Sequence, residues 1–152
     1  MALKRRRKVG MAAAGLLTAA TPLVLGQQAA GAAVTTDEDS VEITFVATST
    51  GETITCTAGL EAVHDTDDPD QPELRIGPWL SGPGVPCIDA TARITASYED
   101  QDGIIRTTRI DGSGAPGGVV QGAYSNTSVT VEFSYDDCQS SVCGVTLTAS
   151  PK

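Results

Sequence analysis

Apolar and polar residues alternate along several short stretches of the chain, and this period of two is typical of half-buried β-strands. In residues 40–47, Val41, Ile43 and Phe45 fall on one face and polar residues fall on the other. Residues 104–110 follow the turn-forming stretch EDQDG and are expected to return as a partner strand. We predict strands there, no helix in the folded domain, and four further strands at 52–58, 89–98, 128–135 and 144–150.

Roughly six or seven short strands with one apolar face each predict an all-β fold. A single sheet would leave its apolar face in water, so we expect two antiparallel sheets packed face to face as a β-sandwich. We describe this architecture as immunoglobulin-like in a broad sense that leaves the strand order open. A small closed barrel is the main alternative.

Residues 1–32 have the pattern of a secretory signal peptide. A cationic head, LKRRRK, precedes an apolar run and then small residues that form an Ala-x-Ala site. We expect cleavage near Ala32 or Ala33, a flexible acidic segment at 33–39 and one folded domain at 40–152. The mature protein is therefore expected to be extracellular and not inserted in a membrane. The Ala-rich and Arg-rich leader is typical of actinobacteria.

Removal of this leader would leave a strongly acidic domain. The chain holds 10 basic and 19 acidic residues and a net charge of −9. The leader contains five of the basic residues and none of the acidic ones, so the remainder carries a charge of −14. The remaining basic residues are scattered and form no stripe that could follow a phosphate backbone. Nucleic acid is therefore not an expected partner.

Four cysteines in a secreted chain predict two disulfides, for which three pairings are possible. Cys138 and Cys143 flank four residues between two predicted strands, so a disulfide can bridge that hairpin. We expect this pair together with Cys56–Cys87, and a crossed pattern with Cys56–Cys138 is the alternative. Redox and zinc roles fit less well, because redox pairs favour two intervening residues beside a helix and the chain has one histidine, His64.

The stretch DDCQSSVCGVTL at 136–147 resembles a Cys-x4-Cys hairpin of the neocarzinostatin-like apoproteins, secreted actinobacterial β-sandwiches that carry enediyne chromophores. The chain is similar to that family in size, acidity and number of cysteines. The resemblance implies a shared sandwich architecture and, as one function, the carriage of a small apolar ligand between the sheets. The chain departs from the family in the long separation of Cys56 and Cys87, and it has no motif that matches the family's ligand cleft.

An acidic stretch, EAVHDTDDPDQPE at 61–73, offers carboxylate oxygens of the kind that bind calcium. Pro69 interrupts the ligand spacing and no glycine supplies the sharp turn of a calcium loop, so we interpret the stretch as a solvated loop. We expect His64, within it, to be exposed, because no Gly-x-Ser-x-Gly nucleophile motif accompanies it. We predict no catalytic residue, no metal ligand and no cofactor.

The stretch RIGPWLSGPGVPC at 75–87 holds three prolines and three glycines, and Cys87 tethers its end. We predict a stiff loop that either presents Trp79 and Leu80 to a partner at low entropic cost or folds Trp79 back over the open end of the sandwich. Tyr124 carries the same two alternatives. These three side chains are the candidate binding residues.

These features predict a small, secreted, non-enzymatic binding or interaction module. We expect it to be a monomer, with an unknown protein or small ligand as its partner. Two alternatives stay open. One is an inhibitor that presents the 75–87 loop to an extracellular protease, and the other is a carrier of a small apolar ligand.

Overall fold

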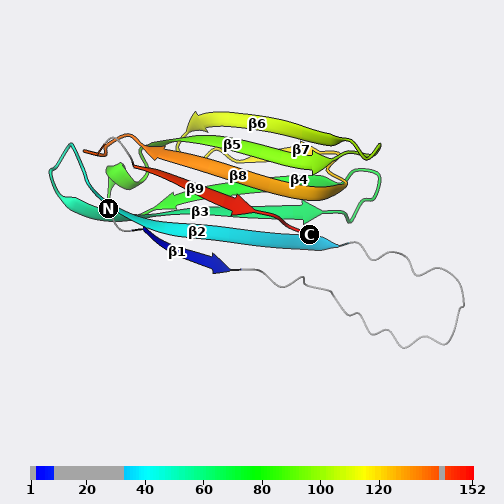
Figure 1. Cartoon of the computed structure of the whole chain (residues 1–152), viewed down its shortest axis with the longest axis horizontal. Coiled ribbons are helices and arrows are strands. Elements are labelled where there is room, and N and C mark those ends of the chain that lie inside the picture. Colours follow the sequence, from blue (N-terminus) through cyan, green and yellow to red (C-terminus); the bar gives the residue numbers. More distant parts are fainter. Residues whose placement is uncertain (1–2, 9–32, 141–142) are drawn as a thin grey trace, which may run out of the picture.

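Two antiparallel sheets pack face to face in the computed structural model, which describes residues 3–8, 33–140 and 143–152 (Figure 1). The first sheet has the order β1-β2-β3-β4-β7 and the second the order β6-β5-β8-β9. The strands are β1 (Leu3–Lys8), β2 (Val34–Val46), β3 (Thr53–Asp65), β4 (Glu73–Ser81), β5 (Ala90–Glu99), β6 (Ile105–Ser113), β7 (Gly118–Gln121), β8 (Ser125–Tyr135) and β9 (Gly144–Ala149). The predicted two-sheet β-sandwich is confirmed. It has two layers of four strands, with β1 added at one edge.

The chain reaches this arrangement by crossing between the layers three times. Strands β2, β3 and β4 form a meander, β5 and β6 form a hairpin in the other sheet, β7 returns beside β4, and β8 and β9 complete the second sheet beside β5. Constant-type immunoglobulin domains instead pair their strands in ABED and CFG sheets. The likeness to that fold therefore lies in the two packed layers and not in the strand order.

The inward faces carry the alternating apolar residues that the sequence indicated. Ile43, Leu60, Ile94, Phe133 and Leu147 are fully or almost fully buried between the sheets. Full burial of a large aliphatic or aromatic side chain contributes about 1.5–3 kcal/mol, so these strands are stabilised mainly by their inward faces.

Strand β4 corrects the prediction of a stiff loop over residues 75–87. Residues 75–81 pair with β3, and the loop begins only at Gly82. Pro78 is compatible with a strand because β7 pairs with β4 only as far as Ile76, which leaves β4 at an edge of the described sheet beyond that point. Proline is tolerated at such edges, since no ladder hydrogen bond is required from its nitrogen.

Strand β2 begins at Val34, in the segment expected to be flexible and acidic. Asp37 and Asp39 point inward, and only 7% and 2% of their surfaces are exposed. Their carboxylates accept hydrogen bonds from the backbone N–H groups of Ser150 (2.7 Å) and Thr148 (3.1 Å). Strand β9 lies at an edge of its sheet, and no strand of the described residues pairs with its outer side. The two carboxylates accept hydrogen bonds from N–H groups on that side. Segment 34–39 is therefore held by its pairing with β3 and by these two hydrogen bonds to β9 and the residue after it.

Strand β3 continues to Asp65, so residues 61–65 belong to a strand and not to the predicted acidic loop. Leu60, Ala62 and His64 follow one another on its inward face. The polar residues that alternate with them suggested a loop, although the period of two continues without a break.

The two disulfides are Cys56–Cys87 and Cys138–Cys143, the pairing that we expected from the sequence. The tip of the β8–β9 hairpin also pairs with the end of β2. The N–H of Gln139 donates to the carbonyl of Val46 (2.9 Å), and the N–H of Thr48 donates to the carbonyl of Asp137 (3.0 Å).

The expected leader is described only at β1, which pairs with β2, and the rest of it, including the expected cleavage region, lies outside the described residues. No helix in residues 3–8, 33–140 and 143–152 is long and apolar enough to cross a membrane.

Candidate binding surface

Trp79 lies on the outer face of the first sheet, in β4, and 42% of its surface is exposed. It therefore neither projects from a loop nor covers the end of the sandwich. The sequence could not indicate this position because it depends on β4 being a strand.

Gly59 of β3 is directly opposite Trp79, and the indole lies over its backbone. A Cβ atom added at Gly59 would approach Cε2 of Trp79 to 1.9 Å, which no real Cβ atom can do. The absence of a side chain at position 59 thus allows the indole to rest on the sheet. This contact holds the ring in place at a partly exposed position.

The outward positions around Trp79 are acidic or small. Ser40 continues the row of Gly59 and Trp79 on β2. One neighbouring row contains Glu38, Glu61 and Gly77, and the other contains Glu42, Thr57 and Ser81. We call these nine residues the Trp79 surface. They include three glutamates and no lysine or arginine.

An exposed indole beside carboxylates favours a ligand that carries positive charge. The face of an indole ring attracts cations, with a contribution of about 0.5–1 kcal/mol at exposed sites. Nearby glutamates add Coulomb attraction that salt screens. The small residues leave the surface around the ring flat, so an extended ligand can approach it.

Leu80 points to the opposite side of β4 and packs, partly buried, against the core. It therefore cannot share a surface with Trp79. The loop that follows β4 does expose apolar residues, with Val85 and Ile88 both largely in solvent. However, Val85–Cys87 forms a short 3-10 turn, η1, and is not extended.

Tyr124 lies near the end of the sandwich, far along the chain from β4. Its N–H donates to the carbonyl of Glu99 (2.9 Å) and its hydroxyl donates to the carbonyl of Asp70 (3.4 Å). A pocket of about 670 Å³ lies beside it, and residues with hydroxyl or amide groups supply much of its lining, including Thr35, Thr66, Ser125, Asn126, Thr127 and Ser150. Tyr124 and Trp79 thus belong to separate parts of the molecule.

His64 also borders this pocket, and the prediction of an exposed loop histidine is wrong. The residue is only 7% exposed, and its Nε2 lies 2.7 Å from the carbonyl oxygen of Ala123. Burial follows from its inward position at the end of β3. The imidazole therefore joins β3 to the segment before Tyr124.

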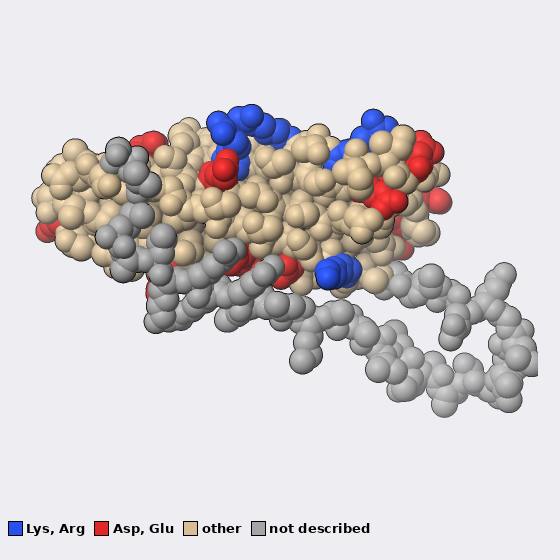
Figure 2. All heavy atoms as spheres, in the orientation of Figure 1, with Lys and Arg blue, Asp and Glu red and all other residues tan. Residues whose placement is uncertain are grey.

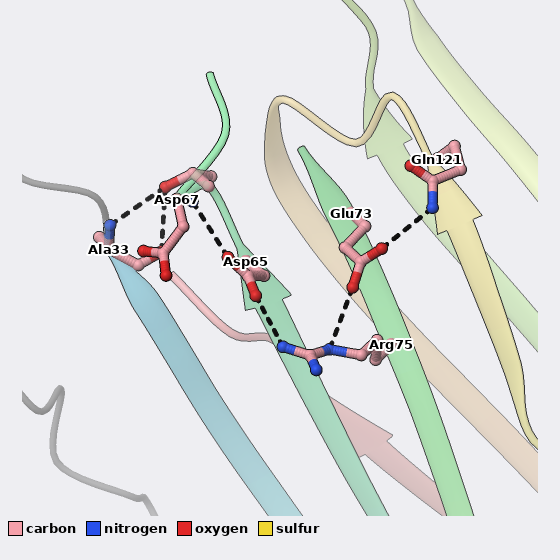
Figure 3. Close-up of polar contacts among 7 residues, drawn as sticks. Ala33, Asp65, Asp67, Glu73, Arg75 and Gln121 are labelled. Atoms are coloured by element: carbon pink, nitrogen blue, oxygen red, sulfur yellow. Dashed lines mark hydrogen bonds and ion pairs between the residues drawn. The ribbon is translucent and has the colours of Figure 1, made fainter. Parts of the chain in front are cut away.

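Two carboxylates of the acidic stretch, those of Asp65 and Glu73, bond to other side chains (Figure 3). Arg75 is held between Asp65, 2.7 Å from its Nη2, and Glu73, 3.3 Å from its Nε. Glu73 also accepts a hydrogen bond from Gln121 of β7 (3.0 Å). Within the described residues, no group of three or more His, Cys, Asp or Glu side chains is arranged to hold a metal ion.

The outer face of the second sheet carries a shallow, open depression of about 750 Å³. Arg93 lies 3.5 Å from Asp111 and 3.8 Å from Glu132, and Arg109 lies 2.8 Å from Asp111. Figure 2 shows basic residues along the top edge, over β6, with acidic residues beside them. The basic residues Arg93 and Arg109 of this face are therefore paired with carboxylates.

Comparisons of the chain with protein-family models, with curated proteins and with solved structures found no match.

Proposed function

We propose that the mature chain is a secreted, non-enzymatic binding module and that the Trp79 surface is its binding site. The observation that carries this proposal is the indole that lies on Gly59, partly exposed, on the outer face of the first sheet. A ring that is already held in place loses little conformational entropy on binding. Tryptophan is also enriched among the residues that dominate binding energy in protein interfaces.

The proposal includes export, since the leader pattern and the two disulfides are both consistent with an oxidising, extracellular location. An acidic domain with a charge of −14 would attract a basic partner over several ångströms at low salt.

The two alternative functions have less support. A protease inhibitor needs an extended and accessible loop, whereas residues 75–81 are paired with β3 and η1 bends the remainder. The carrier alternative rests on the pocket beside Tyr124, whose lining combines apolar surface with hydroxyl and amide groups.

Binding measurements on the exported, leader-free protein test the proposal. The protein and its Trp79→Ala, Trp79→Phe and Val119→Ala variants would be applied to arrays of glycans and of peptides that span a range of charge. Val119 is a matched control, because it is an exposed apolar residue of the same sheet.

We expect Trp79→Ala to weaken the binding of the selected ligand at least about tenfold, equal to about 1.4 kcal/mol. Trp79→Phe should retain part of the affinity and Val119→Ala should retain all of it. An unchanged binding profile for folded Trp79→Ala protein would contradict the proposal.

A further inference from the structure

The outer edge of β2 is paired with the cationic strand β1. Six consecutive residue pairs join the two strands in antiparallel register, from Leu3 opposite Ile43 to Lys8 opposite Glu38. Figure 1 shows β1 as the outermost strand of its sheet, beside β2. Every residue of β1 after Leu3 is lysine or arginine, and the paired segment of β2 contains three acidic residues.

Certain residues of β2 direct their backbone N–H and C=O groups to the edge beside β1. The side chains of the same residues lie on the outer face of the sheet. The carbonyl of Val46 and the N–H of Thr48 both bond to the hairpin tip on the β1 side of β2. Because backbone direction alternates along a strand and the β2–β3 register has no shift, Glu38 and Glu42 direct their N–H and C=O groups to the same edge. The edge thus combines ladder hydrogen-bonding groups with carboxylates on one face.

Removal of the expected leader would take β1 away and leave this edge open. Both disulfides and the buried apolar residues from Val41 to Ala149 would remain in the leader-free chain. An open edge is a template for another strand. Acidic residues on β2 would repel an acidic strand and attract a basic one.

We propose that the β2 edge of the mature protein is a strand-addition site for an extended, Lys/Arg-rich segment of a partner protein. The partner segment would take the place of β1 and form ladder hydrogen bonds with β2, which is a known mode of peptide recognition. Its alternate residues would take the positions that Lys4, Arg6 and Lys8 hold, opposite Glu42, Ser40 and Glu38. In the uncleaved chain, residues 3–8 would compete with the partner.

This inference rests on the proposed function and names the partner's chemistry. The position of Arg6 is in the row of Ser40, Gly59 and Trp79. Adjacent strands are about 4.8 Å apart, so this position and the backbone of Trp79 are separated by about 14 Å. The indole lies over Gly59 and shortens that gap, so a long basic side chain of the partner would reach it.

The test uses a capped peptide with the sequence of residues 2–9, ALKRRRKV, and the exported, leader-free protein. Affinity would be measured by calorimetry at two salt concentrations, and amide hydrogen exchange would locate the contact. Matched probes are a peptide with proline in place of the central arginine, which cannot complete the ladder, and a chain that retains its leader. The variants are Glu38→Gln, Glu42→Gln and, as a control on the other sheet, Glu132→Gln.

We expect the peptide to bind, to protect the amides of Glu38, Ser40 and Glu42, and to bind more weakly at higher salt. The proline peptide and the chain with its leader should both lose most of the binding. Each Glu→Gln change on β2 should weaken it by up to about fivefold, the range of exposed ion pairs, and Glu132→Gln should have no effect.

No binding at about 1 mM peptide would overturn the inference. Equal binding of the proline peptide would also overturn it, because the contact would then be charge attraction without strand addition. The Trp79→Ala variant separates this inference from the proposed function. If the arrays show Trp79-dependent binding of another ligand while the peptide fails, only the inference fails. If the peptide binds by strand addition and no ligand depends on Trp79, only the proposed function fails.

Discussion

Gly59 and Trp79 are directly opposite each other on β3 and β4, and the indole occupies the space that any side chain at position 59 would need. The conformation of Trp79 therefore depends on the absence of a side chain at Gly59. A substitution at Gly59 can test the position of the indole without a ligand.

Gly59→Ala should displace the indole. Its Cβ would lie 1.9 Å from Cε2 of Trp79, so the ring must move off the sheet, and we expect the free energy of unfolding to fall by roughly 1–3 kcal/mol. The displaced ring should emit at longer wavelength and be quenched more strongly by acrylamide. Gly77→Ala is the matched control, because its Cβ would meet nothing closer than the carbonyl oxygen of Glu61 at 3.7 Å. Equal Trp79 emission in both variants would contradict the contact.

Asp39→Ala should destabilise the sandwich by about 1.5–3 kcal/mol, the usual contribution of a hydrogen bond to a charged group. The change removes the acceptor for the N–H of Thr148 and leaves a partly buried donor without this partner. Asp39→Asn, which keeps an acceptor oxygen, should cost less. Urea unfolding measures both changes, with Glu132→Ala as a control for an exposed ion pair. A loss no greater than that of the control would argue against the role of Asp39.

Tyr135 should make the protein less stable at high pH. Burial raises the pKa of its phenol from 10.0 to about 12. The folded state therefore favours the protonated phenol, and the stabilisation is complete below pH 10 and is lost as the pH rises toward 12. Unfolding by guanidinium at a series of pH values measures the loss, and Tyr135→Phe should remove this part of the pH dependence.

Tyr135→Phe has a second expected effect at neutral pH. The phenolic oxygen is buried and has no hydrogen-bond partner among the described residues. Its removal keeps the ring beside Phe45, whose centroid is 5.2 Å away. We expect the free energy of unfolding to stay the same or to rise by about 1 kcal/mol. A large destabilisation would indicate that the hydroxyl does have a partner.

The two disulfides should differ in their contributions to stability. Cys56 and Cys87 are 31 residues apart, and Cys138 and Cys143 are five apart. The chain-entropy relation gives about 3.7 kcal/mol for the longer loop and about 2 kcal/mol for the shorter one. Thermal unfolding of the two double Cys→Ser variants measures the ranking, and mass spectrometry of the unreduced protein checks that no free thiol is present. A reversed ranking would contradict this account.

The strands that the sequence predicted are those whose alternation is uninterrupted. In β2 and β8, Ile43 and Val131 alternate with polar residues over many positions, and the local pattern alone identifies the inward face. Strand β4 was missed because Gly77 and Pro78 are typical of loops, and the edge position that tolerates Pro78 depends on where β7 ends. The residues around Pro78 do not indicate where β7 stops pairing with β4.

The candidate site could be predicted only in part. The sequence left open whether Trp79 is presented or folded back, and its location on a sheet face depends on the register that sets it opposite Gly59, 20 positions earlier in the chain. Leu80 was predicted to share a binding surface with Trp79 because the side chains of neighbouring residues in a loop can point in the same direction. In a strand, the side chains of neighbouring residues point to opposite faces of the sheet. The acidic residues of β2 were assigned to a flexible segment because their backbone and carboxylate partners lie far away in sequence.

The hairpin tip that contains Cys138 also limits the length of any strand that pairs with β2. Gln139 and Asp137 already bond to Val46 and Thr48, so those positions of the edge are occupied. A strand that pairs with the open edge of β2 could therefore not extend beyond Thr44, because the hairpin tip closed by the Cys138–Cys143 disulfide lies there. The hairpin tip would therefore fix the register of an added strand on β2, and this register decides which side chains of the added strand face the indole of Trp79.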